Sequence, residues 1–205
     1  MKARDGTITG SAGQEILHGL PLRWPWLLEV TSDAARMRAP AEISCFPVVA
    51  KAEGIAHRQQ VSAVWRDVAS PQMASLVLEL FAESFGYPLS LTEQIRHDRE
   101  FTVGWQRRPA DEDILMFGAG GSDVGGDVDF RLLPLTRREA ATLVHEYVAD
   151  RSRQARLVAL ILALQDLIAR IPAGAAEVRE IDLNPITFDS DGELIALDWK
   201  VFRSD

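Results

Sequence analysis

The sequence predicts an α/β (α+β) protein in which helices pack against mixed sheets and the chain forms two lobes. Apolar strand-like runs alternate with amphipathic runs, a helical block follows, and a hairpin-like segment comes last. With 205 residues, 47% of them apolar, the chain is long enough to bury a core. We expect residues 1–13 to form a flexible tail and residues 14–205 to form the folded domain.

The first half of the chain alternates between predicted helices and strands. A short helix is expected at residues 14–20, and a second at residues 31–43, which begins with a good N-cap and is disturbed by Pro40. Residues 70–85 predict a helix with Ser at its cap and Pro in its first turn. Apolar, β-prone runs predict strands at residues 24–30, 45–51, 61–68, 89–95, 100–106 and 113–119.

The second half contains two predicted helices and the final hairpin. Thr136 and Glu139 have the spacing of a capping box at the start of a helix over residues 135–150. The longest amphipathic run, residues 153–171, predicts another helix. Residues 180–200 consist of two apolar runs around "DSDG", which is typical of a hairpin turn.

Charge and cysteine content exclude several classes of protein. The net charge of −8, from 22 basic and 30 acidic residues, argues against nucleic acid or an anionic membrane as the main partner. The single Cys45 permits no internal disulfide, and its apolar neighbours place it in the predicted core. The chain contains neither a secretion signal nor an apolar run long enough to span a bilayer. We therefore expect a cytoplasmic protein.

The final hairpin, "EIDLNPITFDSDGELIALDWK", carries polar residues on strands that are otherwise apolar. If residues 190–192 form a three-residue loop, Asn184 faces Asp198 and Asp182 faces Lys200, with Cβ atoms about 5 Å apart. An amide oxygen and a carboxylate at that separation can hold Mg²⁺, which completes its shell with water and phosphate oxygens. The alternative is a solvated hairpin face.

Three further features have a functional and a structural interpretation. The spacing of the glycines in "FGAGGSDVGGD" fits neither the dinucleotide fingerprint nor the P-loop, so this segment either exposes N–H groups to an anion or simply turns. Lys51 ends an apolar strand, where its charge can contact a phosphate or face water. His57 is either a nucleophile or an ordinary surface or core histidine, and no other His or Cys lies at zinc-ligand spacing.

Five segments of the chain are informative when they are taken in order. They are "FPVVAKAEGIAHRQQVSAV", "LTEQIRHDREFTVGWQRRP", "LMFGAGG", "DVDFRLLPLTRREA" and "EIDLNPITFDSDGELIALDWKV". Together they resemble the ATP-grasp domain of ADP-forming acyl-CoA synthetases, a group that includes acetate–CoA ligase and, more distantly, the β subunit of succinyl-CoA synthetase. The resemblance covers residues 14–202.

The resemblance implies an ATP-grasp fold with two subdomains and the nucleotide in the cleft between them. Matched to the family's motifs, Asn184 and Asp198 bind the Mg²⁺ that bridges the ATP phosphates, and Lys51 contacts phosphate. His57 occupies the position of the family's own histidine, which makes it the expected catalytic residue. The remaining expected ATP-binding residues match the family's adenine strand and the glutamate that follows it: Glu93, Gln94, Ile95 and Glu100.

The resemblance also implies a function. The chain would be the ATP-binding, Mg²⁺-dependent subunit of an ADP-forming acid–CoA ligase, which transfers a phosphoryl group between ATP and a phosphohistidine. Its partner would be a CoA-binding, phosphohistidine-carrying subunit, and its substrate a small carboxylate or an acyl-CoA.

Two departures from the family pattern leave an alternative open. Where the family reads His-Lys-Ser/Thr-Asp-x-Gly-Gly-Val, this chain reads "HRQQVSAV", so Ser62 and Ala63 replace the two glycines and Gln60 replaces the acid. After "FGAGG", the segment "SDVGG" is shorter than in the family and lacks its Glu and Lys. The alternative is a catalytically degenerate ATP-grasp module that binds nucleotide or a partner and regulates it.

Overall fold

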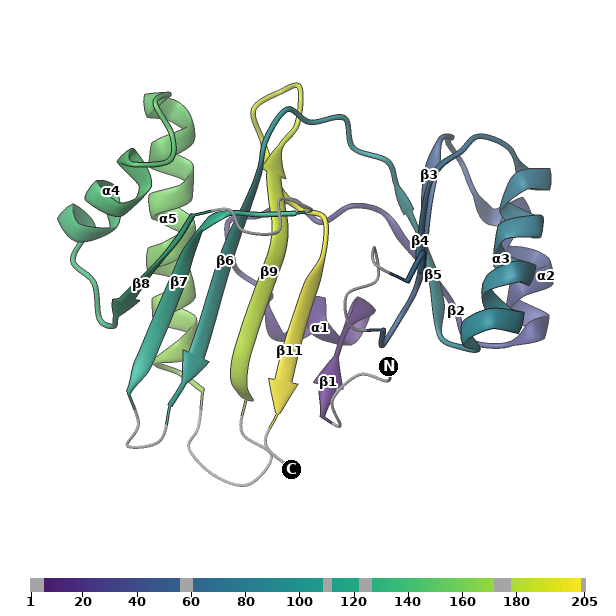
Figure 1. The fold of residues 1–205 in the computed structure, drawn as a ribbon, viewed down its shortest axis with the longest axis horizontal. Coiled ribbons are helices and arrows are strands. Elements are labelled where there is room, and N and C mark those ends of the chain that lie inside the picture. Colours follow the sequence, from purple (N-terminus) through teal and green to yellow (C-terminus); the bar gives the residue numbers. More distant parts are fainter. Residues whose placement is uncertain (1–5, 56–60, 109–111, 122–126, 172–177, 204–205) are drawn as a thin grey trace. The chain divides into compact units, whose positions relative to one another are not determined.

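The computed structural model describes residues 6–55, 61–108, 112–121, 127–171 and 178–203 (Figure 1). It divides into two compact units. Unit 1 consists mainly of residues 25–95, and unit 2 consists mainly of residues 12–24 and 96–205. Each unit has its own sheet and its own helices, and each is described by itself.

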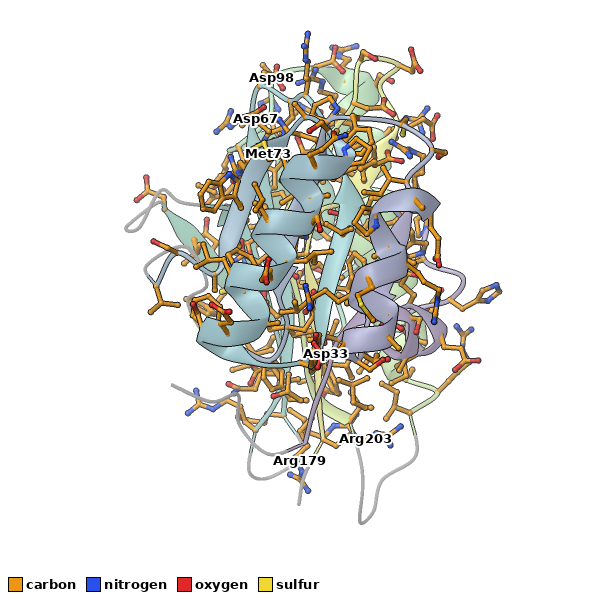
Figure 2. All side chains as sticks on the ribbon, turned by 90° about the vertical axis from the view of Figure 1, so that its right-hand side faces the viewer. Asp33, Asp67, Met73, Asp98, Arg179 and Arg203 are labelled. Carbon is orange, nitrogen blue, oxygen red and sulfur yellow. The ribbon has the colours of Figure 1, made fainter. Side chains whose placement is uncertain are left out.

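Unit 1 is a four-stranded antiparallel sheet in the order β2-β5-β3-β4 with two helices. Figure 2 shows the two helices, α2 and α3, side by side. Ser32 and Ser70 cap them by accepting backbone N–H bonds, as their sequences predict, and Pro40 lies inside α2 without ending it. The elements are β2 (Leu27–Val30), α2 (Asp33–Glu42), β3 (Val48–Ala52), β4 (Val64–Val68), α3 (Pro71–Phe85) and β5 (Leu89–Glu93).

Unit 2 contains a seven-stranded sheet in the order β1-β11-β9-β6-β7-β8, with β10 paired to β9. Its strands are β1 (Thr7–Ile8), β6 (Glu100–Arg107), β7 (Asp113–Ala119), β8 (Val128–Leu132), β9 (Val178–Phe188), β10 (Leu194–Ala196) and β11 (Trp199–Arg203). Its helices are α1 (Gly10–Ile16), α4 (Arg137–His145) and α5 (Arg151–Ile168). The capping box predicted at Thr136 and Glu139 is present at the start of α4.

The two faces of the unit 2 sheet differ because side chains alternate along each strand. One face carries large buried side chains and is covered by helix α5, against which α4 packs (Figure 1). Phe101, Val103 and Trp105 of β6 belong to this core, with Phe117 of β7 and Leu183 of β9. The residues between them, which include Thr102, Asp182 and Asn184, point to the opposite face.

The structure corrects several details of the predicted fold. Residues 7–16, placed mostly in the flexible tail, form β1 and α1, because Thr7 and Ile8 pair with β11 near the other end of the chain. Strand β8 was not predicted as a strand. In the described part of the chain, the paired strands run antiparallel, and an isolated bridge between Arg23 and Ile195 is parallel. Cys45 is exposed and does not lie in the core.

In the described ranges, none of the helices combines the length and apolar character needed to cross a bilayer.

Candidate functional site

The hairpin near the end of the chain has the predicted register. The backbone N–H of Asp189 donates to the carbonyl of Glu193 over 3.0 Å and closes the three-residue turn between them. Further along, the N–H of Asn184 donates to the carbonyl of Asp198 over 3.1 Å. The prediction that Asn184 faces Asp198 is therefore confirmed, because the turn and the strand pairing beyond it both have the predicted register.

Both predicted metal ligands have one side-chain oxygen already oriented by a backbone N–H group. Asp198 Oδ1 accepts from the N–H of Trp199 at 3.1 Å, and Asn184 Oδ1 accepts from the N–H of Gly121 at 3.1 Å. Because an N–H donor must face the amide oxygen and not its NH₂ group, the second bond fixes the orientation of the Asn184 amide. Each of these oxygens has a second lone pair, and hard cations are bound through such oxygen lone pairs.

Asp182 adds a carboxylate to the same face of the sheet. It pairs in register with Lys200, and its Oδ1 is buried and has no hydrogen-bond partner among the described residues. Burial raises the pKa of Asp182 to about 6; Lys200 lowers this pKa, and the charges of Asp198 and Glu180 raise it. The face next to the Asn184–Asp198 pair is therefore rich in oxygen atoms and close to negatively charged groups.

The oxygen donors of this face fit Mg²⁺ better than a transition metal. In the described part of the chain, no three His, Cys, Asp or Glu side chains come together in a way that could hold a metal ion. A cation at Asn184 and Asp198 would thus take two protein oxygens and complete its shell with water and phosphate, which is the usual behaviour of Mg²⁺.

The glycine-rich segment after β7 is more than a plain turn. Gly121 adopts a φ of +79°, and a Cβ atom at this position would overlap the Glu100 carboxylate. The preceding Gly120 donates its N–H to the carbonyl of Glu100 over 3.1 Å. Glu100 Oε1 in turn lies 2.7 Å from His97 Nε2. The glycines thus let the backbone approach both Glu100 and Asn184.

Unit 1 holds the other expected nucleotide-binding residues. Lys51 lies in β3, opposite Ser90 of β5 and Val64 of β4, and its side chain is half-buried. Glu93 ends β5, and its carboxylate accepts the N–H of Trp26 over 3.3 Å. The side chain of Glu93 therefore fastens the end of the expected adenine strand to the segment before β2.

The Gln94 side chain also has a structural contact. Gln94 Oε1 accepts the N–H of Asp67, and Gln94 Nε2 donates to Asp67 Oδ1, each over 2.6 Å. This closed pair ties the residue after β5 to the edge strand β4, where Asp67 has a φ of 57°. Ile95 follows directly and is half-buried.

The loop that departs from the family pattern is described only in part. His57 and Gln60 lie outside the described residues. Ser62 has a φ of 55°, which is the left-handed conformation that glycine adopts most easily. Ala63 is fully buried, and its carbonyl accepts the N–H of Ala52 over 2.9 Å. Ser62, the first of the two residues that replace glycine, therefore keeps a backbone conformation suited to glycine although it carries a side chain.

The structure thus places the expected residues in two groups. Glu100, Asn184 and Asp198 belong to unit 2, while Lys51 and residues 93–95 belong to unit 1. Sequence reasoning missed the links that Gly121 makes to Asn184 and Glu100, and the contact between His97 and Glu100. These depend on tertiary contacts of a glycine segment, for which no local pattern exists.

The chain thus consists of two α/β units, and the facing pair Asn184 and Asp198 lies on the sheet of unit 2. The chain matches the ATP-grasp domain family over residues 1–202 and belongs to it. This confirms the resemblance and the fold class inferred from the sequence. ATP-grasp domains in general bind ATP and Mg²⁺.

Named relatives are ADP-forming ligases. The chain is 30% identical to acetate–CoA ligase [ADP-forming] I of Archaeoglobus fulgidus over 91% of its own length, but it spans only 30% of that relative. It is 25% identical to the β subunit of acetate–CoA ligase [ADP-forming] II of Pyrococcus furiosus, over 86% of this chain and 81% of that subunit.

A solved structure supports the fold. It is an acetyl-coenzyme A synthetase 1 of Ca. Korarchaeum cryptofilum, in complex with coenzyme A and Mg-AMPPCP. It matches with a TM-score of 0.68 and 22% identity, over 97% of this chain and 93% of that chain.

Proposed function

We propose that this chain is the ATP-binding module of an ADP-forming acid–CoA ligase, and that it binds Mg²⁺–ATP. The observation that carries the proposal is the facing pair Asn184 and Asp198, each with one oxygen oriented by a backbone N–H. The names of the relatives support the reaction class, since each is an ADP-forming acetate–CoA ligase or a subunit of one.

Each residue then has a defined task. Asn184 and Asp198 would hold the Mg²⁺, which neutralises charge on the ATP phosphates. Gly121 donates its N–H to Asn184 Oδ1 and so fixes the orientation of the amide, which would leave the second lone pair of this oxygen to the cation. Lys51, from unit 1, would place a point charge on a phosphate oxygen.

In this proposal, residues 93–95 would line the adenine site through a strand end that side-chain contacts hold in place. Glu93 is bonded to the segment before β2, and Gln94 is bonded to β4. A strand end fixed in this way is preorganised for binding, which lowers the ordering cost of the complex. Glu100 would lie close to the nucleotide and is oriented by His97 and the glycine segment.

The phosphoryl group must travel from ATP to an acyl-CoA site, which we place on a CoA-binding partner. That partner is either a separate subunit or another part of a longer polypeptide, and it would carry the phosphohistidine. His57 would be a second phosphoryl acceptor, since a neutral imidazole is a competent nucleophile. Acid-labile ³²P mapping with γ-labelled ATP tests this role, and unchanged turnover in His57→Ala with label only on the partner would exclude it.

Calorimetric titration of ATP into the full chain, with and without Mg²⁺, tests the binding function. We expect measurable binding that becomes tighter in Mg²⁺, because the metal bridges the phosphates to two protein oxygens. No heat of binding in either condition would contradict the proposal. A coupled acyl-CoA synthesis assay with the CoA-binding partner tests the ligase reaction.

The substituted loop favours a second candidate, a catalytically degenerate module that binds nucleotide and regulates its partner. Ser62 stands at a position with positive φ where the family pattern has glycine, and a side chain there restricts how closely a phosphate can approach. Mg²⁺–ATP binding without acyl-CoA synthesis by the complete complex would favour this candidate.

A further inference from the structure

Thr102 of β6 is buried in an unusual way. Its side chain is 2% exposed, and its hydroxyl has no hydrogen-bond partner among the described residues. Thr187 of β9 is also fully buried, but its hydroxyl donates to the carbonyl of Arg99 over 2.7 Å. Burying a hydroxyl without a partner destabilises a protein. An unpartnered hydroxyl in a strand therefore needs an explanation.

The register of the sheet places Thr102 beside the proposed metal pair. The β6–β9 ladder runs evenly up to the pair Val103 and Leu183 and then shifts, so that Phe101 pairs with Ile186. If the pairing continues by one residue from Val103 and Leu183, Thr102 lies opposite Asn184. Pro185 is then the extra, unpaired residue of a β-bulge. Asn184 is in turn opposite Asp198.

On its other side, Thr102 pairs with Gly118 of β7. Gly118 has no side chain, so β7 offers no polar group to the hydroxyl in this row. The neighbouring row contains Gly104 opposite Asp182, and the Asp182 carboxylate also has an oxygen without a partner. Two unsatisfied buried oxygens therefore lie on the same face of neighbouring strands, next to Asn184.

We propose that the Thr102 hydroxyl is a binding contact for the phosphate groups of the Mg²⁺–nucleotide that Asn184 and Asp198 hold. This inference rests on the proposed function. A hydroxyl donates one hydrogen bond, and a phosphate oxygen is a strong charged acceptor, so the bond made on binding is of the charge-assisted kind. The stability lost by burying the hydroxyl is offset when the nucleotide binds.

Thr102→Val tests the inference because it keeps the shape of the side chain and removes the hydroxyl. We expect the ligand-free variant to melt about 2 to 4 °C higher than the wild type, since an unsatisfied buried group is removed. We expect its Kd for Mg²⁺–AMPPCP to rise about 10-fold or more. Thr102→Ser retains the hydroxyl and should bind within about 3-fold of the wild type.

Two control variants give the result its meaning. Thr187→Val removes a hydroxyl that has a partner, so it should lower the melting temperature. Thr142→Val changes an exposed threonine of α4, and its Kd should match that of the wild type. Opposite changes in melting temperature, a rise for Thr102→Val and a fall for Thr187→Val, would distinguish an unsatisfied hydroxyl from one that stabilises the fold.

The outcomes separate this inference from the proposed function. If the wild type does not bind Mg²⁺–AMPPCP, the proposed function fails and the inference fails with it. If the wild type binds and Thr102→Val binds equally well, only the inference is overturned. A lower melting temperature of Thr102→Val with unchanged Kd would also overturn it, because the hydroxyl would then serve the fold through a bound water.

Discussion

Gly121 performs two tasks at the residue scale. Its N–H orients the Asn184 amide, and its missing side chain leaves the space that the Glu100 carboxylate occupies. Both depend on a positive φ, which glycine adopts without steric cost. The sequence predicted a glycine-rich segment after a strand but left open whether it turned or contacted a ligand. The answer depends on Glu100 and Asn184, which approach Gly121 only in the folded chain.

We predict that Gly121→Ala destabilises the protein and weakens Mg²⁺-dependent ATP binding. Gly192 is the matched control, because its φ of +78° is nearly the same as the +79° of Gly121. The two positions differ in space: an added Cβ at Gly192 has no atom within 4 Å, but at Gly121 it would overlap the Glu100 carboxylate. Both substitutions should cost about 1 to 2 kcal/mol from backbone strain. Gly121→Ala should cost more and should raise the Kd for Mg²⁺–ATP, as measured by melting curves and calorimetry. Equal effects of the two substitutions would contradict the role of Gly121.

Lys51 provides a test of charge without a change of fold. Lys51→Met keeps the aliphatic stem, so the melting temperature should change little. The affinity for ATP should fall by about 1 to 3 kcal/mol, the usual size of a charge-assisted contact. Arg38→Met is the control, since Arg38 is an exposed cation of α2 in the same unit. If Lys51→Met unfolds the protein, the charge of Lys51 has a structural role.

At the element scale, features that depend on neighbouring residues were predicted correctly, and features that depend on distant residues were missed. Helices α2, α3 and α4 begin at predicted caps, because a cap is formed by residues three positions apart. The hairpin register was predicted from its turn for the same reason. Strand β1 and helix α1 were missed because β1 exists only by pairing with β11. Cys45 was misplaced because apolar neighbours in sequence do not determine burial.

A hydrogen bond joins Asp129 of β8 to Tyr147, which follows α4, and it predicts that the stability of the protein depends on pH. Tyr147 donates to Asp129 Oδ2 over 3.0 Å, and burial, followed by this bond, raises the pKa of Tyr147 to about 12 from 10.0. The folded state therefore keeps the phenol proton at pH values where the unfolded chain loses it. It follows that stability falls as the pH rises from about 10 to about 12.

Tyr147→Phe should remove this contribution to the alkaline loss of stability, while it keeps the ring that packs on Phe117 at 5.3 Å. At neutral pH the variant should be less stable by about 1 kcal/mol, because Asp129 loses a donor. Urea unfolding at pH 7, 10 and 11.5 measures both effects. A wild-type pH profile identical in shape to that of Tyr147→Phe would contradict the assignment.

At the scale of the whole molecule, the two units divide the expected site residues between them. Lys51 and residues 93–95 lie in unit 1, and Glu100, Asn184 and Asp198 lie in unit 2. The order of motifs along the chain was sufficient to identify the ATP-grasp family, which the family match over residues 1–202 confirms. The contacts that define the roles of these residues involve a nucleotide, so the order of motifs alone does not give them.

The central claim is that Asp198 and Asn184 bind Mg²⁺ together with ATP, and one calorimetric comparison tests it most directly. ATP is titrated in excess Mg²⁺ into the wild type, Asp198→Ala and Asp191→Ala, which removes an exposed carboxylate from the turn of the same hairpin. The account predicts that Asp191→Ala binds like the wild type, while Asp198→Ala loses about 10-fold or more in affinity and most of its response to Mg²⁺. Equal affinity of all three proteins would contradict it.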